Sequence, residues 1–121
     1  MNTGIQNLMA KHRSIRKYKN KTVPTELIES ILTSATKASS SGNMQTYRFI
    51  VTKNESLRRK LSPLHFDQSM VLDAPVFITF CADFHRMRRW VGLSEAPDNF
   101  DNFMSFMIAS IDAILASQNA A

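Results

Sequence analysis

Two short segments carry the side chains that could do chemistry. The first, residues 12–18, reads His-Arg-Ser-Ile-Arg-Lys-Tyr. Side chains of an extended chain alternate between two faces, so Ser14 and Arg16 would share one face. A guanidinium presents paired donors that match phosphate oxygens, and a serine hydroxyl adds a short donor. The segment is a candidate phosphate site, and the alternative, favoured by residue types alone, is a solvated basic run.

The second segment, residues 39–45, reads Ser-Ser-Ser-Gly-Asn-Met-Gln. It follows apolar residues at helical spacing and precedes the strand-like residues 47–52. Small residues with accessible backbone N–H groups suit the close approach of a flat ligand or an anion. The alternative is an ordinary loop between a helix and a strand, in which Ser, Gly and Asn only form the turn.

The pattern of apolar residues predicts the elements that position these segments. Helices are expected over 3–11, 25–38, 55–61 and 85–92, strands over 47–53 and 76–83, a loop or short helix over 64–73, a polar hinge over 95–101 and a final helix beginning between 99 and 102. Strands and helices alternate too sparsely for a doubly wound parallel sheet. The predicted class is therefore α+β, with helices packed on a small mixed or antiparallel sheet.

The order of these motifs resembles the amino-terminal half of the nitroreductase family of flavoenzymes. His12 to Arg16 is followed by a helix opened by Pro24, and then by residues 40–45 leading into a strand. Gln68 in the loop before the second strand is similar to a family position. Two further segments are also similar to family positions: residues 80–86 at the end of the second strand, and the Gln-Asn-Ala sequence that ends the last helix. The resemblance covers nearly the whole chain.

This resemblance implies an FMN site shared between two subunits of a homodimer. The residues it implies are His12, Arg13, Ser14 and Arg16 for the phosphate, ribityl chain and part of the ring; Ser40, Ser41 and Asn43 reaching FMN from the partner subunit; Gln68 beside the ring or ribityl chain; and Gln118 and Asn119 on the last helix. Because the cofactor carries the reaction, the resemblance implies no catalytic residue on the protein.

The implied activity is that of an FMN-dependent oxidoreductase. Hydride would pass from NADH or NADPH to nitroaromatics, quinones or flavins by a ping-pong mechanism. One alternative is a non-catalytic flavin-binding or dimerisation fragment of the same fold. Another is a small basic nucleic-acid-binding protein, because the net charge is +5. Against this last class, the sequence contains no familiar nucleic-acid recognition motif.

Length and composition set further expectations. A chain of 121 residues predicts one domain, residues 1–121, and family members are longer, so we expect it to lack their carboxy-terminal half. The single cysteine, Cys81, cannot form an internal disulfide, which favours a reducing cytoplasm, and we interpret it as a packing residue. No signal peptide, membrane span or metal site is predicted.

Two further clusters have competing interpretations. The bulky residues Phe103, Met104, Phe106 and Met107 could contact a flavin across a dimer, but helical spacing favours core or dimer interface. The basic residues within 85–89 could attract nucleotide phosphates or form a solvated helix face.

Overall fold

The computed structural model describes residues 3–121. Its α-helices are α1 (Gly4–Lys11), α2 (Thr25–Ala35), α3 (Glu55–Leu61), α4 (Met70–Asp73), α5 (His85–Leu93) and α6 (Phe103–Ala120). The strands are β1 (Tyr47–Thr52) and β2 (Phe77–Ala82), and 3-10 turns form at Ser41–Asn43 and Ser62–His65. Within the described residues the fold is therefore α+β, as predicted, and its two-stranded sheet is antiparallel.

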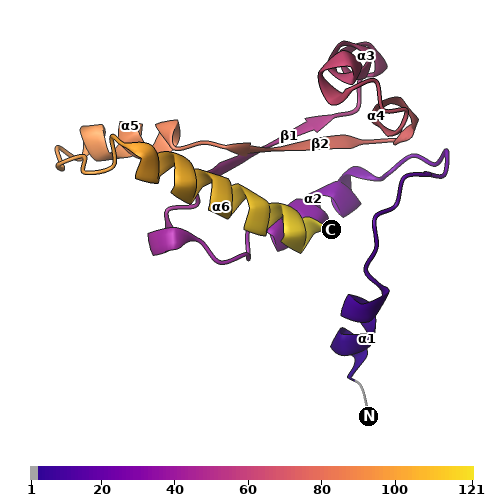
Figure 1. Cartoon of the computed structure of the whole chain (residues 1–121), viewed down its shortest axis with the longest axis horizontal. Helices are drawn as coiled ribbons and strands as arrows, with labels where there is room; N and C mark the ends of the chain where they lie inside the picture. Colours follow the sequence, from indigo (N-terminus) through magenta and orange to yellow (C-terminus); the bar gives the residue numbers. More distant parts are fainter. Residues whose placement is uncertain (1–2) are drawn as a thin grey trace.

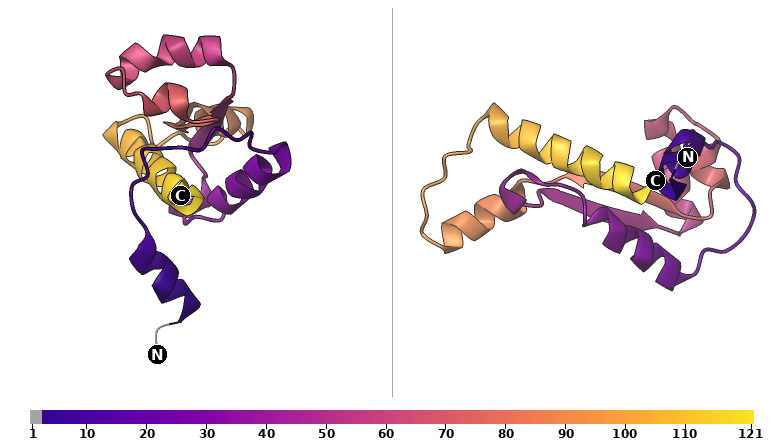
Figure 2. Two further views of the ribbon diagram at one scale, coloured as in Figure 1. Left: turned by 90° about the vertical axis from the view of Figure 1, so that its right-hand side faces the viewer. Right: turned by 90° about the horizontal axis from the view of Figure 1, so that it is seen from below.

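The sheet supports the long helix α6. Tyr47 lies opposite Ala82 and Thr52 opposite Phe77, so the two strands pair along their whole length. Helix α6 runs along one face of the sheet with α2 beside it, whereas α3 and α4 lie at one end and α5 at the other (Figures 1 and 2). The core lies where α2, α6 and β1 meet. It is formed by Tyr47 with Ala35, Ala113 and Ala116, whose small side chains let the helices approach the sheet closely.

Side-chain caps begin α1 at Thr3 and α3 at Asn54. Thr3 accepts a hydrogen bond from the backbone N–H of Gln6 at 3.3 Å, and Asn54 accepts one from Leu57 at 3.1 Å. The second helix was predicted three residues too long, because α2 ends at Ala35 rather than at residue 38. There the backbone tightens into bonds between residues three apart, such as Ala38 N–H to Ala35 O.

The strand predictions are also slightly too long. The first was expected to reach residue 53 but ends at Thr52, and the second was expected over 76–83 but spans Phe77–Ala82. These differences of one residue fall where strand pairing ends, and they do not change the topology.

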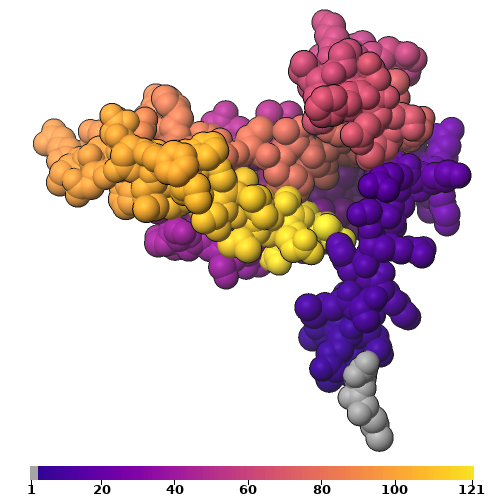
Figure 3. Space-filling view, in the orientation of Figure 1, coloured from indigo at the N-terminus to yellow at the C-terminus, as the bar shows by residue number. Residues whose placement is uncertain are grey.

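Helix α1 stands away from the body of the molecule (Figure 3). Its apolar side chains are uncovered: Ile5 and Leu8 are each 73% exposed and Met9 is 72% exposed. None of the helices in residues 3–121 is long and apolar enough to cross a membrane.

The interpretation of the bulky α6 residues as core is wrong for this chain. Phe103 is 72% exposed and Phe106 is 59% exposed, and Met104 and Met107 also face outward. The buried face of α6 consists of small or polar residues instead: Ser105, Ala109, Asp112, Ala113 and Ala116. The small residues pack on the sheet, which leaves the large apolar residues on the open face. The interface alternative stays a prediction.

Candidate functional site

The first candidate site is a hollow between the segment after α1 and the end of α6. It encloses about 1080 Å³, and we call it the basic hollow. Five of the predicted cofactor residues line it: His12, Arg13, Ser14, Gln118 and Asn119. The structure therefore brings together two groups of residues that lie about a hundred positions apart in the sequence.

The walls of the basic hollow combine cationic and apolar groups. Lys11 and Arg13 supply positive charge, and Arg13 forms no ion pair within residues 3–121. Ile15 and Tyr18 line the same hollow, and the Tyr18 hydroxyl donates a hydrogen bond to the Ile15 carbonyl at 2.9 Å. Such a site offers donors to an anion and an apolar surface to a flat group.

Asn119 links the basic hollow to the core of the fold. Its side-chain amide donates to the Ser34 carbonyl, in α2, at 3.1 Å. This bond fixes the end of α6 against α2 and so fixes the position of Gln118 and Asn119 relative to the core. Arg16 and Gln68, which were also predicted to contact the cofactor, do not line this hollow.

The second candidate element is the loop of residues 40–46, which we call the anchored loop. Its Ser40 hydroxyl donates to the Asp112 carboxylate at 2.7 Å and accepts from the backbone N–H of Gln45 at 2.8 Å. Ser40, Ser41 and Asn43 lie outside the basic hollow of their own chain. Their predicted contact is with a partner's cofactor, and it stays a prediction.

Asp112 was missed by the sequence analysis, although it is fully buried, with 0% exposure. It accepts hydrogen bonds from the Ser41 and Thr46 backbone N–H groups at 3.1 and 3.2 Å, and from the Thr46 hydroxyl at 2.9 Å. The available signal was a carboxylate on the same helical face as Ala109, Ala113 and Ala116, because an acid on a buried face needs hydrogen-bond donors.

The environment of Asp112 keeps it ionised. Burial acts to raise the pKa of its carboxyl group. The hydrogen bonds from Ser40, Ser41 and Thr46 outweigh that effect and lower the pKa below its ordinary value. Asp112 is therefore a buried, charged acceptor at the centre of the anchored loop.

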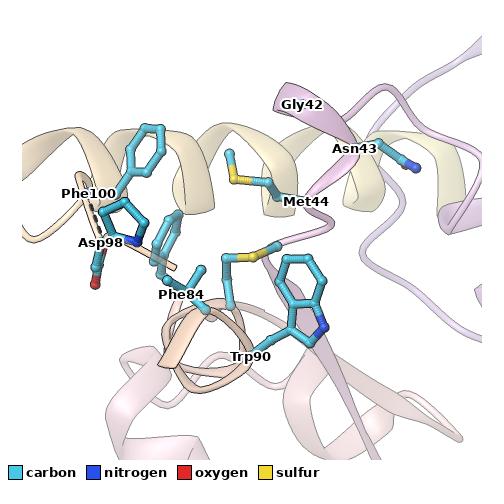
Figure 4. A pocket seen from close by; sticks show the side chains of 10 residues that line it. Gly42, Asn43, Met44, Phe84, Trp90, Asp98 and Phe100 are labelled. Carbon is cyan, nitrogen blue, oxygen red and sulfur yellow. Dashed lines mark hydrogen bonds between the residues drawn. The ribbon is translucent and has the colours of Figure 1, made fainter. Parts of the chain in front are cut away.

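An aromatic pocket of about 470 Å³ lies beside the anchored loop, whose residues Gly42, Asn43 and Met44 contribute to its lining. Phe84, Met87, Trp90 and Phe100 line it together with Met44. Figure 4 shows Met44 and Trp90 facing this space, with Gly42 and Asn43 at its edge. The lining favours an apolar, polarizable or aromatic ligand.

Arg88 holds one wall of the aromatic pocket in place. Its guanidinium lies 2.7 Å from the Asp101 carboxylate and 3.8 Å from that of Asp98, and it donates to the Phe100 carbonyl. Arg86 donates to the Gln45 carbonyl of the anchored loop. These two members of the basic cluster on α5 thus bind groups of their own chain, while Arg89 is exposed.

Cys81 is partly buried in β2 with a free thiol. Its partner across the sheet is Arg48, which pairs with Asp83 at 2.9 Å. Within residues 3–121, His, Cys, Asp and Glu side chains form no group of three suited to a metal ion.

Comparisons with known proteins agree with this architecture. The chain is 34% identical to the FMN reductase (NADPH) of Bacillus subtilis, over 98% of its own length and 48% of that protein's. It superposes on the structure of B. megaterium NfrA2 with a TM-score of 0.91 at 35% identity, covering 99% of this chain and 49% of that one. An NADPH:FMN oxidoreductase from Vibrio harveyi, solved with NAD+, matches with a TM-score of 0.81 at 26% identity, covering 96% and 48%.

The chain spans about half the length of the curated relatives it matches. The sequence model of the nitroreductase family matches residues 9–99, a region that includes the segment after α1, the anchored loop and the aromatic pocket wall on α5. By its sequence and its fold, the chain belongs to the nitroreductase family.

Proposed function

We propose that the chain functions as an FMN-dependent oxidoreductase that uses NADH or NADPH as electron donor. The observation that carries this proposal is the basic hollow, where Arg13 and Ser14 meet Gln118 and Asn119. A guanidinium with no ion pair in the described part of the chain, a hydroxyl and two amides form a donor set that fits a phosphate and a polar chain. The relatives named FMN reductase support the same cofactor.

Each part of the basic hollow has a role in this proposal. Arg13 and Ser14 bind the phosphate, with His12 beside them, and Arg16 strengthens the positive potential around the segment. Gln118 and Asn119 orient the cofactor from α6, and Ile15 and Tyr18 exclude water from one side. Bound FMN would supply the chemistry itself, taking hydride from the nicotinamide donor and passing it to a nitroaromatic, quinone or flavin in a ping-pong cycle.

The proposal includes a homodimer, in which Ser40, Ser41 and Asn43 reach the cofactor from the partner subunit, while Gln68 lies beside the flavin ring or ribityl chain. Support comes from the apolar side chains left open on α1 and α6, among them Leu8, Phe106 and Ile114. An uncovered apolar surface on two neighbouring elements is typical of a protein interface. The aromatic pocket beside the anchored loop would then receive the apolar electron acceptor.

The donor groups of the basic hollow also support a second candidate function, in which the chain holds FMN without carrying out the catalytic reaction. Under this candidate the chain binds FMN or dimerises and does not oxidise NAD(P)H.

The first experiment is a visible absorption spectrum of the purified chain after incubation with FMN and removal of free flavin. The proposed function predicts retained flavin bands and oxidation of NADH or NADPH when an acceptor is added. Retained flavin with no oxidation would favour the second candidate. Failure to retain flavin by a chain with helical circular dichroism would contradict the proposed function and would leave only the dimerisation form of the second candidate.

Arg13→Ala tests the residue assignment. The variant should bind FMN more weakly by about 1.5–3 kcal/mol, because hydrogen bonds to charged groups are worth roughly that much. Arg59→Ala is the matched control, because Arg59 is an exposed arginine on α3, paired with Glu55 and outside the hollow. Equal FMN affinity of the two variants, measured by flavin fluorescence, would contradict the assignment.

A further inference from the structure

We infer that Asp112 is a positioning residue for cofactor binding: from within α6 it holds the anchored loop in the one conformation that can present Ser41 and Asn43 to a flavin. The inference rests on the proposed function, because the role of this loop in binding FMN is part of that proposal. Asp112 itself has 0% exposure, so it cannot touch a cofactor and must act through the loop.

Asp112 forms hydrogen bonds with both ends of the anchored loop. Oδ2 accepts from the Ser40 hydroxyl and from the backbone N–H and hydroxyl of Thr46, and Oδ1 accepts from the Ser41 N–H. One side chain thereby fixes the start and the end of a seven-residue loop against α6. Hydrogen bonds to an ionised carboxylate are stronger than those between neutral groups, so both ends of the loop are held tightly against α6.

The backbone between these two ends is strained. Gly42, Asn43 and Gln45 have φ angles of 57°, 53° and 50°, all in the left-handed region. Glycine adopts this region freely and asparagine tolerates it, but it is costly for glutamine. Such a conformation persists only where surrounding contacts impose it, and it is concentrated at ligand-binding sites. The contacts with Asp112 supply that constraint.

The same contacts decide which atoms of the loop remain for a ligand. The Ser40 hydroxyl has one hydrogen, and it is donated to Asp112. Its oxygen also accepts from the Gln45 N–H. Ser40 therefore donates to the anchor, whereas the exposed Ser41 hydroxyl and the exposed Asn43 and Gln45 amides are side-chain groups able to donate to a flavin.

Asp112→Asn tests the inference with almost no change in side-chain shape. Asparagine keeps one carbonyl oxygen for Ser40 and Thr46 but turns an NH2 group toward the Ser41 N–H, so that bond is lost. Hydrogen exchange of the backbone in residues 40–46 should accelerate at least about tenfold, and FMN should bind about tenfold more weakly, since one such bond is worth about that factor.

Thr46 provides a second pair of variants in case Asp112→Asn fails to fold. Thr46 is 1% exposed, so a change there can reach a ligand only through the loop. Thr46→Val removes the hydroxyl bond to Asp112 at nearly constant shape, and it should weaken FMN binding, whereas Thr46→Ser keeps the hydroxyl and should bind like the parent chain.

Ser105→Ala is the matched control for loss of a buried polar group on α6. Ser105 is 7% exposed and bonds to the Asn102 carbonyl and Arg88, away from the anchored loop. It should leave both FMN affinity and hydrogen exchange in residues 40–46 unchanged. This control separates a specific effect on the loop from a general loss of stability.

The outcomes separate the inference from the proposed function. Weaker FMN binding and faster loop exchange in Asp112→Asn and Thr46→Val, but not in Thr46→Ser or Ser105→Ala, would support the positioning role. A parent chain that binds FMN and variants that bind it equally well would overturn the inference alone. A parent chain that does not bind FMN would overturn the proposed function and the inference with it.

Discussion

Tyr47 carries a hydroxyl group that has no hydrogen-bonding partner within residues 3–121, although the residue is only 5% exposed. Its ring stacks on Phe49 with 5.0 Å between the ring centroids, so the aromatic part of the side chain is well packed. Burial raises the pKa of this hydroxyl, and the nearby Asp112 carboxylate adds to that rise. The hydroxyl is thus neutral, buried and unpaired.

Tyr47→Phe should therefore leave the free energy of unfolding unchanged or raise it by about 1 kcal/mol, because a buried unpaired polar group is removed while the packing stays. Urea unfolding followed by circular dichroism measures this difference. Tyr18→Phe is the matched control, because the Tyr18 hydroxyl donates to the Ile15 carbonyl and its loss should not stabilise. A clear loss of stability in Tyr47→Phe would show that the hydroxyl is paired in solution.

Asp112 makes the folding stability of the chain depend on pH in the acidic range. In the folded chain, hydrogen bonds lower the pKa of the Asp112 carboxyl group below its ordinary value of 3.8. The stabilisation of the fold by the ionised carboxylate is therefore complete above pH 3.8. It is lost as the pH falls through the lowered pKa. Asp112→Asn should be less stable at pH 7 and should lose less stability between pH 5 and pH 2, as measured by urea midpoints. Parallel curves for the parent and the variant would contradict this assignment.

At the scale of elements, Arg88 joins α5 to the segment that leads into α6. Its guanidinium binds Asp98 and Asp101, donates to the Phe100 carbonyl, and lies 6.0 Å from the centre of the Phe84 ring. Because the Arg88 side chain is 39% exposed, water screens these ion pairs. The segment of residues 95–102 is therefore held by a contact that salt should weaken.

Arg88→Ala should raise backbone hydrogen exchange in residues 95–102 and reduce overall stability by about 1 kcal/mol or less, as expected for exposed ion pairs. Exchange measured by mass spectrometry would test this. The neighbouring exposed residue supplies the control, and Arg89→Ala should change neither quantity. Equal exchange in both variants would mean that the segment is held by Phe100 and Pro97 packing alone.

Local pattern was enough to predict most elements. The cap residues Thr3 and Asn54 each act on a backbone group within three positions, so the sequence alone reveals them. The strand residues 47–52 carry their own β-branched and aromatic signal. Within the candidate site, the placement of Arg13 and Gln118 in one hollow was available only through family resemblance, because nothing local connects them.

What could not be predicted depends on distant contacts. Asp112 binds Ser40 across 72 positions, and no local pattern records such a bond. The exposure of Phe103 and Phe106 could not be predicted either. Apolar residues have the same spacing on a helix that packs on its own core and on a helix that packs against a partner. The face that packs on the sheet was marked by alanines, which carry little hydrophobic signal.

At the scale of the whole molecule, the chain exposes more surface than its mass predicts. Its accessible area is 9446 Å², whereas a compact protein of 13.7 kDa should expose about 6600 Å². The excess of about 2800 Å² is larger than the roughly 1000–2500 Å² that each partner buries in a stable dimer. Helix α1, which stands apart from the body, and the open face of α6 contribute to this excess (Figure 3).

Ile114→Glu should convert a dimer of this chain into monomers, because Ile114 is 65% exposed on the open face of α6 and a buried unpaired carboxylate is costly. Light scattering coupled to size exclusion measures the mass. Leu64→Glu is the control, because Leu64 is 75% exposed next to α3, at the end of the sheet, and should leave the dimer intact. A parent chain that is monomeric at every concentration would contradict the proposed dimer.

The contact between Thr46 and Asp112 also has a consequence during synthesis. The two residues are 66 positions apart, and a ribosome adding roughly 5–20 residues per second needs about 3–13 s to pass from one to the other. During that interval the loop has no carboxylate to hold its left-handed residues, and it samples open conformations. The loop is made early and acquires its shape late, when α6 leaves the ribosome and docks on the sheet.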